Sequence, residues 1–208
     1  MHPKELSDKA KTFSVGLNIV DRLLMVWRPM ICPYHILMEH IPAGSSVLDV
    51  GCGTGLWLFL LSRFGRLSKG VGIEIDDKKV EIANSIKTPQ DNLEFFQFAK
   101  EDKWPAGSYD CLTMIDVLHH ILPNQQQAFL SKINEINARR IVFKDIDPQA
   151  KVKCLTNSLH DILLSRQLPR YCKKEKVAAQ LESLGYRIKY IARHDMLWYS
   201  HYVIVAGK

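Results

Sequence analysis

The sequence predicts an α/β protein built on a mostly parallel, doubly wound sheet. Short apolar runs alternate with amphipathic segments at the spacing of βαβ units. The first run, Val47–Val50, breaks into a turn with three alternating glycines and then enters an apolar helix. The last two runs are too close together for a crossover helix, so they must pair antiparallel.

Apolar periodicity predicts seven strands and the helices between them. The expected strands cover 46–50, 70–75, 93–98, 109–115, 140–146, 186–192 and 199–206. The expected connecting helices cover 55–64, 77–87, 123–137, with Pro123 in the first turn, and 173–184.

Helices are also expected outside this alternation. Before the sheet, an amphipathic helix over 8–28 carries Phe13, Leu17, Val20, Leu24 and Trp27 on one packing stripe, and Pro29 is expected to stop it. A short helix over 34–40 follows. After the fifth strand, a helix over about 150–167 is expected as an insertion, because no strand follows it directly. We therefore expect one domain over 1–208, in which 1–44 form an N-terminal helical lid and 45–208 form the core.

Composition narrows the class of protein. No apolar run approaches the ~18 residues needed to span a bilayer, and the start lacks the apolar stretch of a signal peptide, so we expect a cytoplasmic protein. Five scattered cysteines without a C-x-x-C pair predict free, buried thiols and no metal site. Residues 139–193 hold 13 Lys or Arg against 5 Asp or Glu, which indicates either a solvated basic face or an anionic partner.

The glycine turn reads Val-Leu-Asp-Val-Gly-Cys-Gly-Thr-Gly over 47–55. Leu56 stands where a dinucleotide fingerprint needs its third glycine, which disfavours a nicotinamide dehydrogenase. Asp49, just before the glycines, suits a cationic or amine-bearing ligand. Glu74 ends the next strand about 20 residues later, where a carboxylate can accept hydrogen bonds from both ribose hydroxyls.

Together with Tyr-Asp-Cys-Leu-Thr-Met-Ile-Asp-Val-Leu-His-His-Ile over 109–121, these motifs resemble the class I S-adenosylmethionine-dependent methyltransferases over roughly 45–206. The resemblance implies a Rossmann-like seven-stranded sheet in the order 3-2-1-4-5-7-6 with an antiparallel last strand. It also implies S-adenosyl-L-methionine as cofactor and gives its contacts to Asp49, Gly51, Cys52, Gly53, Gly55, Glu74, Ile75 and Asp116. Phe-Ala-Lys at 98–100 replaces the usual Gly-Asp-Ala, so the contact to the adenine amino group is expected elsewhere, at Glu101 or Asp102.

The acceptor is less well defined. The chain lacks the Asn/Asp-Pro-Pro-Tyr/Phe and Pro-Cys motifs of base methylation, and their absence makes a nucleic-acid acceptor less favoured. His119 or His120 is either a general base for a hydroxyl acceptor or a packing element.

Four further motifs are Arg-Pro-Met-Ile-Cys-Pro-Tyr over 28–34, Ile-Asp-Val-Leu-His-His over 115–120, Lys-Asp-Ile-Asp over 144–147 and Trp-Tyr-Ser-His-Tyr over 198–202. Their arrangement resembles small bacterial methyltransferases encoded with polyketide or fatty-acid-type synthases, such as those for aryl polyenes. It implies that Lys144, Asp145, Tyr199 and His201 border the acceptor. We expect a small or acyl-carrier-bound acceptor that is anionic, aromatic or acyl. The alternatives are an RNA methyltransferase and a catalytically idle protein that binds S-adenosylmethionine.

Overall fold

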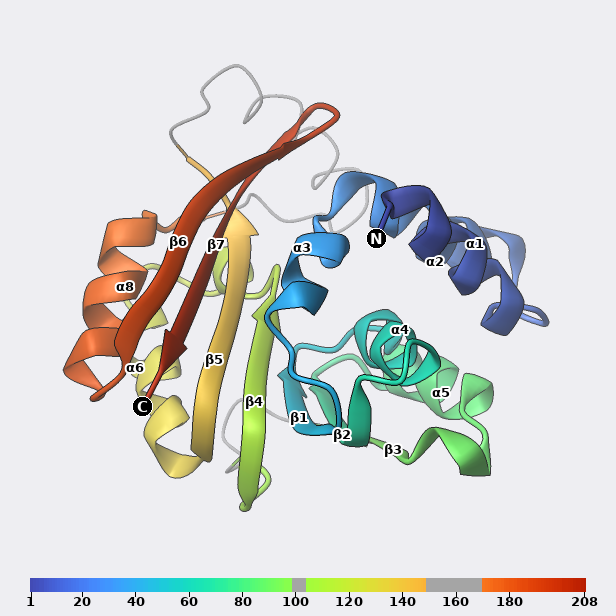
Figure 1. Cartoon of the computed structure of the whole chain (residues 1–208), viewed down its shortest axis with the longest axis horizontal. Helices are drawn as coiled ribbons and strands as arrows, with labels where there is room; N and C mark the ends of the chain where they lie inside the picture. Colours follow the sequence, from blue (N-terminus) through green and yellow to red (C-terminus); the bar gives the residue numbers. More distant parts are fainter. Residues whose placement is uncertain (99–103, 149–169) are drawn as a thin grey trace.

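The computed structural model describes residues 1–98, 104–148 and 170–208. Its centre is a seven-stranded sheet in the order β3-β2-β1-β4-β5-β7-β6, which confirms the expected order (Figure 1). The strands are β1 (Ser45–Val50), β2 (Leu67–Glu74), β3 (Leu93–Gln97), β4 (Ser108–Ile115), β5 (Asn137–Ile146), β6 (Arg187–Met196) and β7 (Tyr199–Gly207). The first five pair in parallel, whereas β7 is antiparallel to both β5 and β6.

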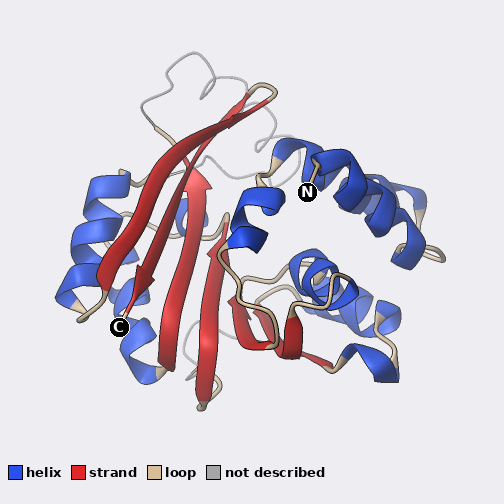
Figure 2. Ribbon diagram, in the orientation of Figure 1, coloured by secondary structure: helices blue, strands red, loops and turns tan. Residues whose placement is uncertain are grey.

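Helices cover both faces of the sheet (Figure 2). One face packs against α1 (Pro3–Phe13), α3 (Tyr34–Glu39), α4 (Leu56–Arg63) and α5 (Asp77–Ile86), and α2 (Ile19–Ile31) joins the same layer. The other face packs against α6 (Gln126–Ser131) and α8 (Lys174–Ser183). Short 3₁₀ turns cover Pro89–Asp91, Leu118–His120 and Lys132–Glu135.

The N-terminal segment corrects the prediction of one helix over 8–28. Two helices occur there, α1 and α2, separated by a turn in which Gly16 has a φ of +95°. Asn18 starts the second helix, because its side-chain oxygen accepts hydrogen bonds from the backbone N–H groups of Val20 and Asp21. Pro29 does not stop the helix but lies inside its last turn, where its fixed φ is compatible with helix and only one backbone bond is lost.

Other boundaries also differ. The expected helix over 123–137 is shorter, since Pro123 precedes α6 and the segment after α6 is a 3₁₀ turn. The last two strands run on to a turn of only Leu197 and Trp198, and Leu197 has a φ of +50°. The expected insertion over 150–167 and the expected adenine contacts Glu101 and Asp102 lie outside the described residues. Four cysteines, Cys32, Cys52, Cys111 and Cys172, are buried free thiols, as predicted.

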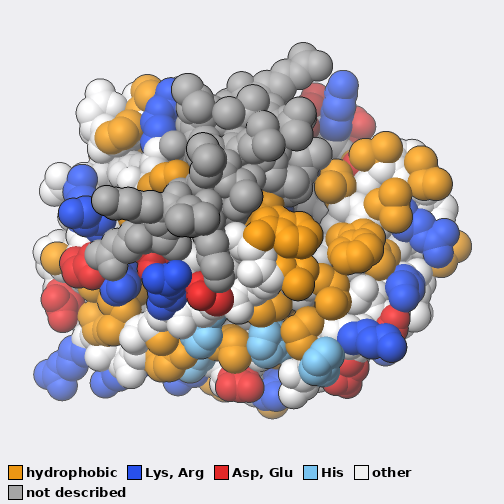
Figure 3. Space-filling view, turned by 90° about the horizontal axis from the view of Figure 1, so that it is seen from above, with side chains coloured by type: hydrophobic (Ala, Val, Ile, Leu, Met, Phe, Trp, Pro, Cys, Tyr) orange, Lys and Arg blue, Asp and Glu red, His pale blue; other side chains and the backbone are white. Residues whose placement is uncertain are grey.

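Helix α2 presents an apolar face to solvent. Its side chains Ile19, Val20, Leu23, Leu24 and Trp27 are between 45% and 74% exposed and recur at the spacing of one helix face. The prediction of one packing stripe was therefore wrong beyond Leu17, because only Met25 and Pro29 of this helix are buried. Figure 3 looks onto the edge where the parallel strands end and shows hydrophobic side chains gathered over the N-terminal helices.

Within the described residues, no helix combines the length and the apolar character that a bilayer crossing demands.

Candidate active site

The carboxyl ends of the parallel strands bring the predicted site residues to one edge of the sheet. Asp49 on β1 lies beside Thr113 on β4 in the strand register, and Met114 lies beside Phe143 on β5. Open α/β sheets bind their ligands in the crevice outside these carboxyl ends. The edge is therefore the place to look for a cofactor.

In the glycine turn after β1, Gly51 is needed for close packing and Gly53 leaves open space for a ligand. Gly51 has a φ of +73°, and a Cβ added there would lie 2.6 Å from Val117 Cγ2, so packing excludes any side chain. Gly53 has a φ of +57°, but a Cβ there would meet nothing within 4 Å. The space above Gly53 is thus open and lets a ligand approach the backbone.

Cys52 contributes only its backbone to this surface. Its side chain is turned toward β2, since a Cβ at Gly72 would lie 2.7 Å from Cys52 Sγ. The backbone N–H groups of Gly51 and Cys52 both donate to Ile73 O, at 2.8 and 3.1 Å. At the end of the turn, a Cβ on Gly55 would lie 2.8 Å from the Phe95 ring, so this glycine also serves packing. The turn is anchored to β2 and β3.

Asp49 is a buried carboxylate without a cationic partner in the part of the chain that the structure describes. It is 2% exposed, and its Oδ1 accepts a hydrogen bond of 2.6 Å from Thr113 Oγ1. Burial raises its pKa to about 7, although the Thr113 bond acts in the opposite direction. Among the described residues no Lys, Arg or His forms an ion pair with it. A carboxylate held in this way suits the ammonium group of a ligand.

Glu74 ties the end of β2 to the glycine turn. Its Oε2 accepts a hydrogen bond of 2.8 Å from Gly53 N, and its Oε1 accepts from the backbone N–H groups of Ile75 and Asp76. The carboxylate is thereby fixed while each oxygen keeps acceptor capacity for a hydroxyl. Ile75 is 53% exposed next to it and offers an apolar surface. Both residues fit a nucleoside.

An ionic centre lies beyond β4. Asp116 has a φ of +59°, which is uncommon outside glycine. Its Oδ2 pairs with Arg28 Nη2 at 2.8 Å and its Oδ1 with Lys144 Nζ at 2.5 Å. Burial acts to raise the pKa of Asp116, but the charges of Lys144 and Arg28 outweigh it and hold the pKa well below its usual range. Lys144 is fully buried, so it acts through Asp116 and is not open to solvent.

His119 is paired with Asp145. Its Nδ1 lies 2.5 Å from Asp145 Oδ1, and its backbone N–H donates to Asp145 Oδ2. With Nδ1–H as the donor, Nε2 is the proton acceptor of the ring. His120 stands beside it with ring centroids 4.1 Å apart, but its side chain is exposed at the surface. Partial burial of the ring, and then the neighbouring His119, lower the pKa of His120 to about 4.

Asp116, His119 and Asp145 offer ligand atoms within 4.8 Å of one another, which is a spacing that a metal ion accepts. In this structure, however, Arg28 and Lys144 take the two oxygens of Asp116, and His119 Nδ1 takes Asp145 Oδ1. The protein's own hydrogen-bond donors therefore already engage these carboxylates.

His201 connects the sheet to α2. Its Nε2–H donates to Ile31 O at 2.7 Å, whereas its Nδ1 is buried and has no hydrogen-bond partner in the described part of the chain. Burial lowers its pKa to about 3, so the ring is neutral. Tyr199 stacks on it with ring planes 8° apart. Tyr199 and His201, two of the four residues expected at the acceptor border, thus lie together at the beginning of β7.

Three residues of this edge were missed as site residues by sequence reasoning: Arg28, Thr113 and Val117. Arg28 lies 88 positions from its partner Asp116, and no local pattern joins the two. Thr113 carried a usable signal, because it stands near the end of a strand just as Asp49 does. Val117 is identified only by the space that it takes above Gly51.

The fold and the site define a domain of the S-adenosylmethionine-binding methyltransferase class. The chain belongs to the family described as "Methyltransferase domain", which it matches over residues 28–190. The ribosomal protein L11 methyltransferase of Burkholderia multivorans is 29% identical over 126 residues, which are 61% of this chain and 38% of that protein. The chain therefore spans less than half of the length of that relative.

Two solved structures share the fold over nearly the whole chain. Magnesium protoporphyrin IX methyltransferase from Synechocystis PCC 6803, with bound S-adenosylhomocysteine, has a TM-score of 0.66 at 18% identity and covers 97% of this chain and 93% of its own. The same enzyme was also solved with bound S-adenosylmethionine. The protein that binds the Trm112 methyltransferase activator of Haloferax volcanii has a TM-score of 0.72 at 14% identity, with coverage of 98% and 97%.

Proposed function

We propose that the protein transfers the methyl group of S-adenosylmethionine to a small or carrier-bound acceptor that has an aromatic or acyl body and a negative charge. The observation that carries this proposal is the position of Arg28. It lies on the helix whose apolar face is exposed, and its guanidinium reaches the cofactor edge at Asp116. An acceptor that contacts both the apolar face of α2 and the guanidinium of Arg28 needs an apolar surface and an anionic group.

The cofactor fits the residues at this edge. In this proposal Asp49 holds the ammonium group, Glu74 accepts the ribose hydroxyls and Ile75 lies against the adenine. The open space at Gly53, the hydrogen bond from Gly53 N to Glu74 and the exposed side chain of Ile75 support these roles. When bound, S-adenosylmethionine supplies a methyl group already activated by its sulfonium. The remaining tasks of the protein are to align the acceptor and to exclude water.

The pair of His119 and Asp145 supports a hydroxyl acceptor. In that case the acceptor oxygen would receive the methyl group that the cofactor supplies, and His119 Nε2 would take the hydroxyl proton. Asp145 then stabilises the resulting imidazolium through Nδ1. Lys144 and Asp116 are positioning residues in this proposal, because they fix Arg28 and the segment before His119.

A basic surface beside His119 supports a carrier-bound acceptor. The backbone N–H of Arg170 donates to His119 O at 2.9 Å, and Lys173 and Lys174 follow at the start of α8. Acidic carrier proteins are attracted to such a cluster. We include in the same proposal a role like that of the methyltransferases encoded with polyketide or fatty-acid-type synthases, including those for aryl polyenes. The expected cytoplasmic location is also part of it.

The test is a methylation assay with an aromatic or polyunsaturated acyl group, offered as a free acid and as a thioester on an acyl carrier protein. Mass spectrometry of the acceptor should show one added methyl group, and S-adenosylhomocysteine should appear in equal amount. Arg28→Met should raise the KM for a charged acceptor about tenfold or more, as expected for a lost charged hydrogen bond. An uncharged analogue should be affected much less.

Two outcomes would decide against the proposal. Intact cofactor binding without turnover of any acceptor would favour an idle binding protein, and turnover of RNA alone would favour an RNA methyltransferase. For the carrier, glutamate reversal of Arg170, Lys173 and Lys174 should weaken turnover of the carrier-bound acceptor but not of the free acid. The matched control reverses Lys4, Lys87 and Arg187, which are exposed elsewhere.

A further inference from the structure

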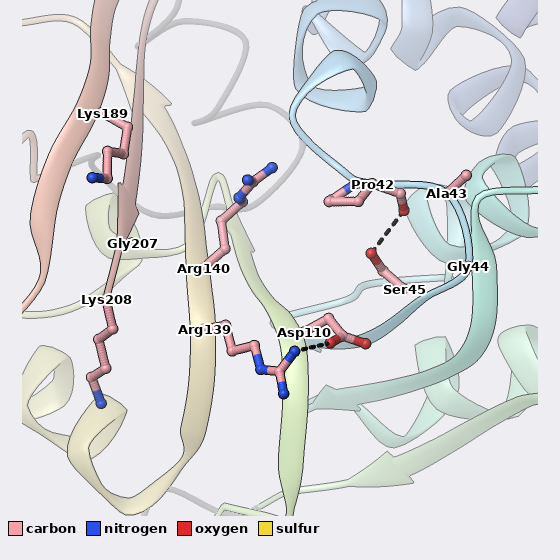
Figure 4. Close-up of a pocket in the computed structure, with 10 residues that line it drawn as sticks. All are labelled: Pro42, Ala43, Gly44, Ser45, Asp110, Arg139, Arg140, Lys189, Gly207 and Lys208. Atoms are coloured by element: carbon pink, nitrogen blue, oxygen red, sulfur yellow. Dashed lines mark hydrogen bonds and ion pairs between the residues drawn. The ribbon is translucent and has the colours of Figure 1, made fainter.

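A basic pocket of about 440 Å³ lies away from the cofactor edge (Figure 4). Four cationic residues and one acidic residue line it, together with a short loop; the lining residues are Pro42, Ala43, Gly44, Ser45, Asp110, Arg139, Arg140, Lys189, Gly207 and Lys208. The ammonium group of Lys208 lies over the Tyr186 ring, so Arg139, Arg140 and Lys189 are the cations that carry the proposal. We propose that this pocket binds a small phosphate-bearing anion.

The pocket is separate from the cofactor site. Its residues lie near the beginnings of the parallel strands: Ser45 is the first residue of β1, Asp110 is near the start of β4, and Arg140 is near the start of β5. The cofactor edge lies at the opposite ends of these strands. Arg140 precedes Lys144 by four positions on β5, which places their backbones about 13 Å apart. A ligand in this pocket is therefore a second ligand.

The cations of the pocket are poorly neutralised. Arg140 Nη1 donates to the backbone O of His40 at 2.7 Å, which fixes the guanidinium without cancelling its charge. The described residues contain no carboxylate paired with Arg140 or Lys189. Asp110 Oδ1 pairs with Arg139 Nη1 at 3.8 Å, beyond hydrogen-bond distance, while its Oδ2 accepts hydrogen bonds from the N–H and hydroxyl of Ser46. Those bonds also lower the pKa of Asp110. Positive charge dominates the pocket.

The shape of the pocket is fixed by the backbone. Ser45 Oγ donates to Pro42 O at 2.7 Å and Ser45 N donates to Arg66 O at 3.0 Å, so the loop is held at both ends. The stem of Lys189 runs alongside Gly207, since its Cε would lie 3.7 Å, an ordinary contact distance, from a Cβ at that glycine. Figure 4 shows Arg139 directed toward Asp110 and Arg140 toward the loop that holds Pro42. The volume matches small-molecule sites.

Protection of the sheet edge does not explain these charges. Lysines and arginines on an edge strand discourage pairing with other chains, and Lys189 lies on the edge strand β6. Arg139 and Arg140, however, lie on β5, which is paired on both sides by β4 and β7. These two belong to the basic segment 139–193 noted in the sequence, and a bound anion gives them a role.

The probe is inorganic pyrophosphate, added to the ¹⁵N-labelled full chain at low ionic strength. We expect saturable shifts of the amide signals of Gly44, Ser45 and Gly207, while those of Gly51 and Gly53 stay unchanged. Arg139→Ala/Lys189→Ala should weaken binding at least tenfold. Ala43→Trp, which fills the pocket and keeps every charge, should weaken it similarly.

The matched control, Lys4→Ala/Lys87→Ala, removes the same charge from exposed positions elsewhere and should leave pyrophosphate binding within about twofold. Equal weakening by both double variants would reveal general attraction to a basic protein, and shifts that do not saturate would also overturn the proposal. Affinity for S-adenosylhomocysteine, measured in parallel, should be the same in all variants. This separates the anion site from the methyltransferase proposal.

Discussion

Thr113 Oγ1 donates a hydrogen bond of 2.6 Å to Asp49 Oδ1 and so joins the two central strands just before the glycine turn. Asp49 has a pKa raised by burial to about 7, and a cationic ligand requires it in the charged form. Between pH 5.5 and 7, cofactor affinity should therefore increase with pH, approaching tenfold per unit at the acid end. Calorimetry with S-adenosylhomocysteine over this range measures the effect.

Thr113→Val is the matched variant for this prediction. It removes the one bond that lowers the pKa of Asp49, so the midpoint of the affinity curve should move to higher pH. Asp49→Asn should bind weakly, with no pH dependence from this group. A wild-type affinity that is flat across the range would show that Asp49 is not the ammonium partner.

Glu74→Gln should weaken S-adenosylhomocysteine binding about 10- to 100-fold. The amide group would face the N–H of Gly53 or of Ile75, so a charged hydrogen bond becomes a repulsive contact. The control is Glu94→Gln, an exposed glutamate on β3 that pairs with Lys69. Equal affinity of the two variants would contradict the ribose assignment.

Gly51→Ala should lower the free energy of unfolding by about 2–4 kcal/mol, from left-handed backbone strain and overpacking against Val117. The double variant Gly51→Ala/Val117→Ala should recover the part that comes from the contact. Gly53→Ala carries the backbone strain alone, because the space above it is open. Urea unfolding tests all three, and a Gly53 variant that is as destabilised as the Gly51 variant would refute this account.

Asp116→Asn should destabilise the protein by about 3–5 kcal/mol, because it leaves the buried Lys144 without its counter-charge. Asp116→Asn/Lys144→Met should regain most of this loss. The pKa of Asp116 is lower in the folded than in the unfolded chain, so its contribution is present above pH 4 and disappears as the pH falls. The difference in unfolding free energy between wild type and Asp116→Asn should therefore be smaller at pH 3 than at pH 7, which urea unfolding at the two pH values measures.

The fold was predictable because its signals are local. Apolar runs, the glycine turn and the short gap before β7 each reveal a strand or a connection, and the sheet order followed from the family resemblance. The break at Gly16 and Asn18 was overlooked because the apolar residues on both sides keep nearly helical spacing. Propensity alone does not show that a helix will leave its apolar face in solvent.

For the site, residues in the turn and at strand ends were predicted because a ligand there needs a particular residue type. Arg28 and Thr113 were missed because their roles depend on register and on contacts over 64 to 88 positions. Their partners Asp49 and Asp116 were visible only as isolated acids in sequence. The pairing of charged side chains is set by the folded structure and cannot be seen in the sequence.

Among the described residues, the hydrogen bonds that join α2 to the edge of the sheet lie near the carboxyl end of the helix. Arg28 is bonded to Asp116 and the carbonyl of Ile31 to His201, whereas Ile19 and Val20 at the other end are largely exposed. If α2 swings when ligands enter or leave, its carboxyl end is the hinge and its amino end makes the larger excursion. A spin label at Val20 would then report the motion over several ångströms, while one at Met30 would stay nearly stationary.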